Sequence, residues 1–132
     1  MYLLDTNICI YAMKGMFPKL KDRLFEIQPD SIKISSVTEY ELAYGVAKSK
    51  WGEKSRNAMQ MFISSFEVLP FDATDSLYAG LLRAELERKG TPIGAYDVMI
   101  AAQCLSRELT LITHNIKEFQ RVPNLTIEDW AE

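Results

Sequence analysis

The residues best placed to do chemistry near the start of the chain are Asp5, Thr6 and Asn7. Residues 2–4, just before them, are predicted to form a buried strand, because so short an apolar run bounded by polar residues suits the interior of a parallel sheet. Asp5 then lies at the carboxyl end of that strand, the edge at which α/β sheets bind ligands. The alternative is that Asp5 or Thr6 merely caps the helix beginning near Asn7.

Two further carboxylates, Asp97 and Glu41, are candidates to join Asp5. Asp97 is the only charge in residues 90–106 and begins a helix that is apolar on almost every side. A carboxylate there is costly unless it is paired, hydrogen-bonded or metal-bound, although the dipole of a helix start would also favour it. Glu41 lies in a helix that follows a strand predicted at 32–34, and the apolar periodicity of that helix leaves open whether Glu41 faces a cleft or solvent.

Four other polar residues have a structural interpretation at helix starts. Ser36 and Glu39 have the spacing of a capping box, which predicts that Glu39 caps its own helix. Asp72 and Asp75 have the same spacing, and the positive end of a helix dipole stabilises their carboxylates. We therefore expect capping, and no metal ligation, from these residues.

The sequence Thr113-His114-Asn115 ends a strand predicted at 110–113 and belongs to the same sheet edge as Asp5. His114 is the only histidine, and no Ser or Cys nucleophile with the usual turn chemistry accompanies it. A structural role is therefore the more economical interpretation of His114.

A long amphipathic helix is predicted over residues 73–89, with Leu77, Leu81 and Ala84 facing the core. Arg83 lies on the same helix. It is interpreted as a solvated side chain, although an Arg that reached an acidic cleft would hold phosphate through paired hydrogen bonds.

Strands and helices alternate along the whole chain, with strands predicted at 2–4, 32–34, 67–69 and 110–113. This alternation predicts an α/β fold in which helices cover both faces of a parallel sheet and the strand-to-helix connections share one edge. Asp5, Glu41 and Asp97 come from three different elements and can converge there. Converging carboxylates raise one another's pKa unless a cation neutralises them, and their oxygens suit Mg²⁺ or Mn²⁺. Such a site can activate water and stabilise charge developing on a phosphodiester.

Length and composition set the remaining bounds. The 132 residues, 48% of them hydrophobic, make one domain, residues 1–132. A net charge of −3 argues against a broad basic surface for nucleic acid but allows a nuclease whose acids line one cleft. The cationic stretch 48–56 is either a phosphate contact or an ordinary solvated turn. No apolar run approaches the roughly 18 residues of a membrane span, so we expect a cytoplasmic protein without membrane contact.

Several motifs in order resemble those of PIN-domain ribonucleases: Leu3-Leu4-Asp5-Thr6-Asn7, Ile34-Ser35-Ser36-Val37-Thr38, Glu41-Leu42-Ala43-Tyr44-Gly45, and Pro92-Ile93-Gly94-Ala95-Tyr96-Asp97 with Ile100-Ala101-Ala102. The closing segments, Leu111 to Asn115 with Glu118-Phe119 and Glu128-Asp129-Trp130, narrow the resemblance to VapC-type toxins. Any one motif is weakly specific, but four in order over the whole chain are specific.

The resemblance implies a three-layer α/β/α fold with a central, mainly parallel sheet of about four to five strands. It implies the toxin of a type II toxin–antitoxin system, a Mg²⁺-dependent endoribonuclease in which Mn²⁺ can substitute. Such an enzyme cuts RNA, with transfer RNA among the candidate substrates, and thereby stops translation and growth. The implied partners are a VapB-type antitoxin that inserts a basic side chain among the acids, and a second copy of the chain in a homodimer or larger assembly.

Carried onto this sequence, the family's catalytic and metal-binding acids match Asp5, Glu41 and Asp97, with Glu39 left as the cap. Supporting polar positions match Thr6, Asn7, Ser36, Thr113 and Arg83. The departure is Asn115, which stands at the fourth acidic position of many PIN domains and can hold a water on the metal but adds no charge.

Two other classes of function remain open on the sequence. A metal-dependent DNA nuclease or phosphatase would keep all three acids on the same scaffold. A catalytically inactive PIN-like binding domain should have lost at least one acid, whereas this chain keeps three.

Overall fold

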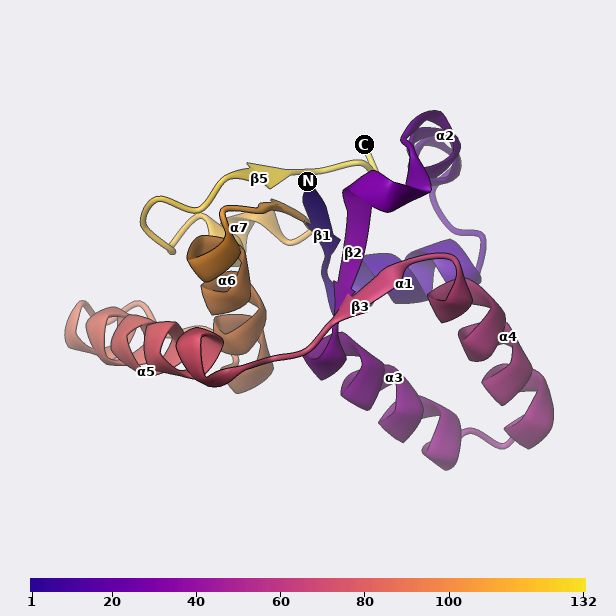
Figure 1. Cartoon of the computed structure of the whole chain (residues 1–132), viewed down its shortest axis with the longest axis horizontal. Helices are drawn as coiled ribbons and strands as arrows, with labels where there is room; N and C mark the ends of the chain where they lie inside the picture. The colour runs from indigo at the N-terminus through magenta and orange to yellow at the C-terminus, as the bar shows by residue number, and fades with distance from the viewer.

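The structure, a computed structural model, describes residues 1–132 and alternates strands with helices throughout (Figure 1). The elements are β1 (Tyr2–Leu4), α1 (Thr6–Met13), α2 (Pro18–Glu26), the 3₁₀ turn η1 (Pro29–Ser31), β2 (Ile32–Ser35), α3 (Ser36–Lys48), α4 (Gly52–Ser64), β3 (Glu67–Leu69), α5 (Ala73–Arg88), α6 (Ala95–Arg107), β4 (Thr110–Ile112), α7 (Ile116–Phe119) and β5 (Ile127–Glu128). None of the helices has the length and apolar character needed to cross a bilayer.

The five strands form one sheet in the order β3-β2-β1-β4-β5, and every pairing is parallel. The predicted α/β class and parallel sheet are therefore confirmed. The first four strands match the predicted ones to within one residue at their carboxyl ends, whereas β5 was not predicted as a strand. It has only two residues, too few to show a period in the sequence.

Two apolar layers cover the sheet. Leu3 and Leu111 face the layer made with α5, α6 and α7, whereas the next residues, Leu4 and Ile112, face the layer made with α1, α2 and α4. This division follows from the alternation of side chains along a strand. Figure 1 shows the two helical groups on opposite sides of the sheet. Because both faces of the sheet are covered, the strands are almost continuous apolar runs in the sequence.

The carboxyl ends of the central strands lie at one level. Leu4 pairs in register with Ile34 of β2 and with Ile112 of β4, so the polar residues that follow these strands share an edge. The chain passes from β1 to β2 on one side and returns to β4 on the other, which makes the gap between β1 and β4 a topological switch point. Asp5 lies at this point.

The start of α3 differs from the prediction. Its N-cap is Ser35, whose hydroxyl accepts a hydrogen bond from the backbone N–H of Val37 at 3.0 Å. Ser36 instead accepts from the N–H of Phe71 at 2.9 Å, and Glu39 is exposed. The predicted Ser36–Glu39 capping box is therefore wrong, because α3 begins at Ser36, one residue earlier than that spacing required.

The core-facing side of α5 also differs from the prediction. Leu82 and Leu86 are buried against the sheet, whereas Leu77 and Leu81 are 63% and 66% exposed. The helix carries two apolar rows, and the row predicted to face the core faces solvent. An unpaired apolar row therefore remains on the surface of the protein.

The start of α5 is fixed by a buried polar network. Asp72 and Asp75 form a reciprocal capping box, as predicted for helix-start residues. Asp75 is also buried and reaches α6, where it accepts hydrogen bonds from Gln103 at 3.2 Å, from the Ser106 hydroxyl, and from Arg107 at 3.0 Å. These bonds tie α5 to α6.

Candidate active site

Asp5 caps its helix, which was one of the two interpretations of the sequence, and it also lies among other acids. It caps α1, since its Oδ1 accepts the N–H of Ile8 at 2.8 Å, and it is buried at the switch point. Burial is the largest cause that raises the pKa of Asp5 to about 6, and the nearby charges of Glu41 and Glu118 raise it further. Hydrogen bonds from Thr113 and Ile8 act in the opposite direction and lower it. The cap therefore fixes a carboxylate that other acids surround.

Glu41 points toward the same edge from the second turn of α3. Its Oε1 accepts a hydrogen bond of 2.6 Å from the hydroxyl of Thr6, next to Asp5. Because Thr6 donates to Glu41, the hydroxyl of Thr38 supplies the proton of the 3.0 Å bond between the two threonines. A chain of two hydroxyls thus orients Glu41, which is half-buried and faces the site.

Asp97 lies at the start of α6 and is the most strongly perturbed acid. Burial, a hydrogen bond with Glu118 and the negative charges of Glu118, Asp5 and Glu41 raise the pKa of Asp97 to about 8. A shift of this kind requires several carboxylates at close range in a partly desolvated position. The three predicted acids, Asp5, Glu41 and Asp97, therefore come together, and Glu118 joins them.

Glu118 is the site residue that we did not predict from the sequence. It lies on the four-residue helix α7, where its Oε2 accepts a hydrogen bond of 2.5 Å from the side-chain amide of Asn115 and its Oε1 accepts the N–H of Gly94 at 3.2 Å. The charge missing at Asn115 is thus supplied one turn later. The available signal was the three-residue spacing at a helix start, which places the two side chains on one face.

The donor set fits a hard divalent cation. Four carboxylates, those of Asp5, Glu41, Asp97 and Glu118, and the carboxamide of Asn115 offer only oxygen ligands. Burial is the largest cause of the raised pKa of Asp97, and the charges of Glu118, Asp5 and Glu41 add to it; a bound cation would offset that repulsion. The cluster is therefore suited to a metal such as Mg²⁺ or Mn²⁺.

The other polar residues predicted for the site differ in whether they contact the acids. Thr113 is buried, donates to Asp5 and accepts the N–H of Asn115 at 3.0 Å, so it links two site residues. Asn7 is exposed on the first turn of α1, and the Ser36 hydroxyl is used by Phe71. The structure does not bring Arg83 to the acids, because its guanidinium pairs with Glu87 at 3.1 Å on the same helix.

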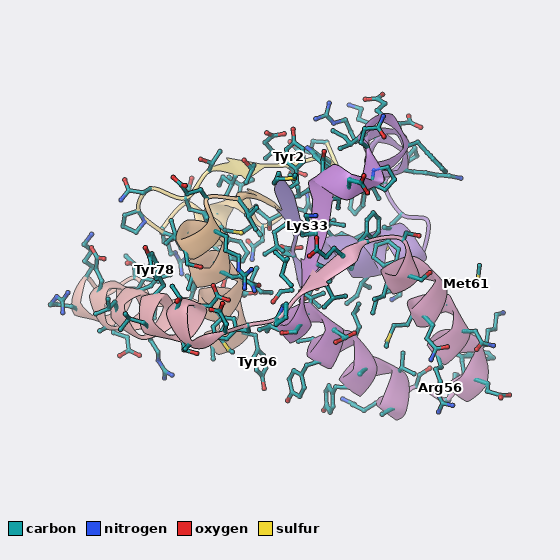
Figure 2. All side chains as sticks on the ribbon, in the orientation of Figure 1. Tyr2, Lys33, Arg56, Met61, Tyr78 and Tyr96 are labelled. Atoms are coloured by element: carbon teal, nitrogen blue, oxygen red, sulfur yellow. The ribbon has the colours of Figure 1, made fainter.

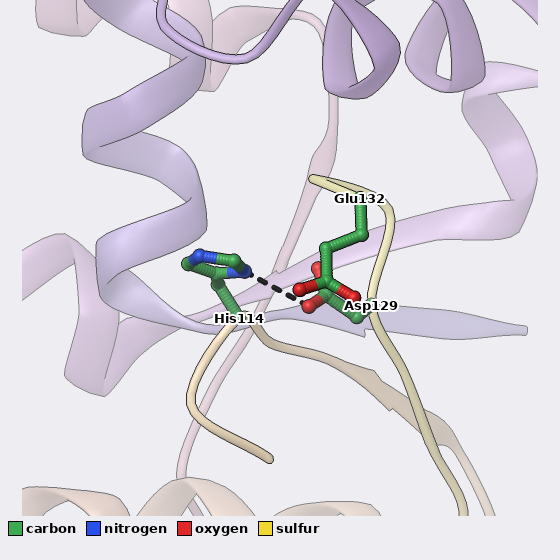
Figure 3. Close-up of side chains that lie close together, drawn as sticks. All are labelled: His114, Asp129 and Glu132. Carbon is green, nitrogen blue, oxygen red and sulfur yellow. Dashed lines mark hydrogen bonds and ion pairs between the residues drawn. The ribbon is translucent and has the colours of Figure 1, made fainter.

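His114 is engaged by the C-terminal segment. Its Nδ1 lies 2.8 Å from Asp129 Oδ2, and its ring packs on Phe17 with centroids 4.9 Å apart. Figure 3 shows Glu132 beside this pair, and ligand atoms of the three residues lie within 4.8 Å of one another. These contacts support the predicted structural role, in which His114 holds the end of the chain against the α1–α2 connection.

An open hollow of about 480 Å³ borders the acid cluster on the α7 side. It is lined by Pro92, Ile93, Gly94, Asn115, Lys117, Glu118 and Arg121. Lys117 and Arg121 place positive charge on its wall, beside the carboxylates. This combination allows a polyanion to approach the acids in spite of the net negative charge of the chain.

A glycine is needed at position 94 because there is no space for a side chain beside the acids. Its backbone conformation is not the reason, since a φ of −56° suits any residue. A Cβ at this position would lie 3.2 Å from Asp97 Oδ2 and 3.9 Å from Glu118 Oε1. We expect Gly94→Ala to lower the activity of this site roughly tenfold by displacing Asp97, with the free energy of unfolding changed by less than about 1 kcal/mol. Gly80→Ala, with no atom within 4 Å of the new Cβ, is the matched control, and equal activity of the two variants would contradict the expectation.

Comparison with known proteins places this site in a family. Residues 2–125 match the PIN domain model. The chain is 43% identical over 130 residues to the tRNA(fMet)-specific endonuclease VapC of Salmonella typhimurium, covering 98% of both chains. It is also 43% identical to ribonuclease VapC2 of Rickettsia felis, covering 98% of this chain and 97% of the relative.

Solved structures agree with the sequence relatives. The DNA-bound VapBC complex of Salmonella typhimurium superposes with a TM-score of 0.93 at 43% identity, covering 98% of this chain and 97% of the other. VapBC2 of Rickettsia felis, bound to a promoter DNA fragment, gives 0.92 at 42% identity and covers 98% of each chain.

The chain therefore belongs to the PIN-domain family, as the α/β fold and the acidic edge of its sheet indicate. Within that family it is a VapC-type toxin, the nuclease component of a toxin–antitoxin pair whose antitoxin is of the VapB type. PIN-domain nucleases generally depend on a divalent metal ion. The resemblance stated from the motifs is confirmed.

Proposed function

We propose that this VapC-type protein is a Mg²⁺-dependent endoribonuclease in which Asp5, Glu41, Asp97 and Glu118 hold the metal ion, with Mn²⁺ as a substitute. The observation that carries the proposal is the convergence of four carboxylates from four separate elements at one edge of the sheet, where burial and the neighbouring acids raise the pKa of Asp97 to about 8. A bound divalent ion would neutralise the acids, activate water and stabilise charge on the scissile phosphate.

The side chains around the acids would keep the site in a reactive arrangement. Thr113 and the start of α1 hold Asp5, the hydroxyl of Thr6 orients Glu41, and the amide of Asn115 orients Glu118. Lys117 on the wall of the hollow would attract the phosphodiester backbone. No histidine is needed for this reaction, in keeping with the engagement of His114 by Asp129.

The antitoxin is proposed to occupy an apolar groove of about 470 Å³ between α1, α3 and α4. Its walls include Ile10, Met13, Leu42, Val46, Trp51 and Met59, and Glu41 lies at its edge. An apolar antitoxin segment seated there would bring a flanking basic side chain to the acids, where the charge is complementary. This arrangement would both bind and neutralise the toxin.

A homodimer is proposed to form through the exposed apolar row of α5, Leu77 and Leu81, with the partly exposed Tyr78 beside it. Figure 2 shows Tyr78 on the outer side of α5.

The RNA substrate is proposed to include transfer RNA, because the Salmonella relative is described as specific for tRNA(fMet).

The proposed reaction is tested by incubating antitoxin-free protein with labelled RNA, including initiator transfer RNA, and with labelled DNA. We expect RNA cleavage that requires Mg²⁺ or Mn²⁺, stops with chelator and disappears in Asp97→Ala, because that variant removes the most perturbed carboxylate of the cluster. Asp22→Ala, an exposed acid on α2, is the control and should cleave normally.

Three results would contradict the proposal. Folded, metal-loaded protein that leaves a broad cellular RNA pool intact would not be a ribonuclease. Cleavage that persists in Asp97→Ala would come from another site or a contaminant. Preferential cleavage of DNA would assign the same acids to a DNA nuclease.

A further inference from the structure

A row of exposed tyrosines begins directly beside the acid cluster. Tyr40 and Tyr96 are the sequence neighbours of Glu41 and Asp97, and their hydroxyls are 3.1 Å apart across the gap between α3 and α6. Their ring centroids lie 5.5 Å apart at an angle of 58°. The pair is thus held in place although both rings are exposed, and Figure 2 shows Tyr96 pointing outward between α6 and α3.

The row continues along α3. Tyr44 lies one turn after Tyr40 and is 59% exposed, and Lys48 lies one turn further with its Nζ 5.0 Å from the centre of the Tyr44 ring. Two packed helices would normally bury aromatic rings, yet these face solvent. The row therefore has no partner within the chain.

This row is separate from the apolar groove on the same helix. The groove uses Leu42, Val46 and Ser49, which follow a different line along α3 from the line that carries the tyrosines. Glu41 lies between the two lines. A ligand on the row and a segment in the groove would therefore meet only at the acids.

We propose that Tyr96, Tyr40 and Tyr44 stack unpaired bases of the RNA strand next to the scissile phosphate, with Lys48 contacting a backbone phosphate beyond them. The proposal rests on the ribonuclease function proposed above. Exposed aromatic rings in a line, with a cation at the end, match single-stranded nucleic acid, because every base has a face that can stack and every nucleotide carries a phosphate. The row begins at the acids, so bound bases would position the adjoining phosphate for cleavage.

The test measures binding and cleavage with the full chain. Affinity for a short unstructured oligoribonucleotide containing 2-aminopurine is measured with chelator present, so that no cutting occurs, and KM and kcat are measured with Mg²⁺. We expect Tyr40→Gln and Tyr96→Gln each to raise Kd and KM about tenfold, with kcat changed less than threefold. Tyr40→Phe and Tyr96→Phe keep the ring and should stay within threefold of the wild type.

Phe25→Gln on α2 is the control, since Phe25 is an aromatic ring that is 79% exposed and lies away from the row. The proposal would be overturned by unchanged affinity in the Gln variants or by an equal loss in Phe25→Gln, and wild-type cleavage would still support the ribonuclease function. Light scattering of each variant is part of the test, because a change in oligomeric state would assign the tyrosines to a contact between copies of the chain and overturn the proposal. A wild type that neither binds nor cuts RNA would overturn both.

Discussion

Replacing Asp97 by Asn is expected to lower RNA cleavage on the order of 1000-fold and, at pH 8.5, to stabilise the metal-free protein by about 2 kcal/mol. Activity falls because a metal ligand is lost. Stability rises because burial and neighbouring acids disfavour the ionised form of Asp97, as its pKa of about 8 shows, and Asn carries no charge. The gain is well below the value for a full shift of pKa, since the side chain is partly exposed and solvent screens it.

The sign of the pH dependence follows from the protons bound. Between the ordinary pKa of 3.8 and the folded-state pKa of about 8, folded Asp97 holds a proton that the unfolded chain has released. The free energy of unfolding of the metal-free wild type therefore falls as the pH rises through this interval, and Asp5 adds a fall that ends near its pKa of about 6. Asp97→Asn should flatten the dependence.

Urea unfolding in chelator at pH 5.5 and 8.5 measures this effect. The advantage of Asp97→Asn over the wild type should be clearly smaller at pH 5.5 than at pH 8.5, because pH 5.5 lies less than halfway along the interval from 3.8 to about 8. Asp22→Asn is an exposed control that should follow the wild type. Excess Mg²⁺ at pH 8.5 should stabilise the wild type more than the variant. An Asp97→Asn protein that is no more stable than the wild type at pH 8.5 would show that the acids do not strain the metal-free fold.

Replacing Asp75 by Ala is expected to lower the free energy of unfolding by about 3 kcal/mol. The change removes the buried carboxylate that accepts from Gln103, Ser106 and Arg107, and these donors keep only their bonds to backbone carbonyls and to the exposed Asp72. Burial alone would raise the pKa of Asp75, but the hydrogen bonds and charge of Arg107 and the bond from Ser106 hold it below its ordinary value. The ionised form is therefore the stabilised one.

Asp72→Ala is the matched control, because it breaks the same capping box at an exposed position and should cost only about 1 kcal/mol. Both variants are compared with the wild type by urea unfolding at neutral pH. Since the pKa of Asp75 is lowered, its contribution is present above the ordinary pKa of 3.8 and is lost as the pH falls below it. Equal losses in the two variants would mean that the contacts with α6 add nothing to the cap.

The sequence allowed most of the fold to be predicted, because its signals were local. The apolar runs that form β1, β2, β3 and β4 stand between helical patterns, and alternation of this kind leaves few topologies. The predictions were wrong where the local sequence allowed two equally good structures. Ser35 and Ser36 can each cap a helix, and the end of β2 decides between them. Likewise, α5 has two apolar rows, and only packing shows which one meets the sheet.

The members of the acid cluster differed in how well the sequence predicted them. Asp5 at a strand end and Asp97 alone on an apolar helix carry signals of their own, whereas Glu41 needed the family resemblance. Glu118 belonged only to a closing motif, and nothing in that polar segment, on a helix of four residues, marked it as a site acid. Its place beside Asp97 depends on how α7 approaches the start of α6, which is a tertiary property.

The acid cluster draws on both ends of the chain, with Asp5 after the first strand and Glu118 on the last helix. β1 occupies the centre of the sheet, and the N–H of Asp5 donates to the carbonyl of Ile112 in β4 at 3.0 Å. During synthesis, β1 leaves the ribosome long before β4 exists, so an unfinished chain lacks both the central pairing and the fourth carboxylate. The four carboxylates can therefore come together only after translation has passed Glu118.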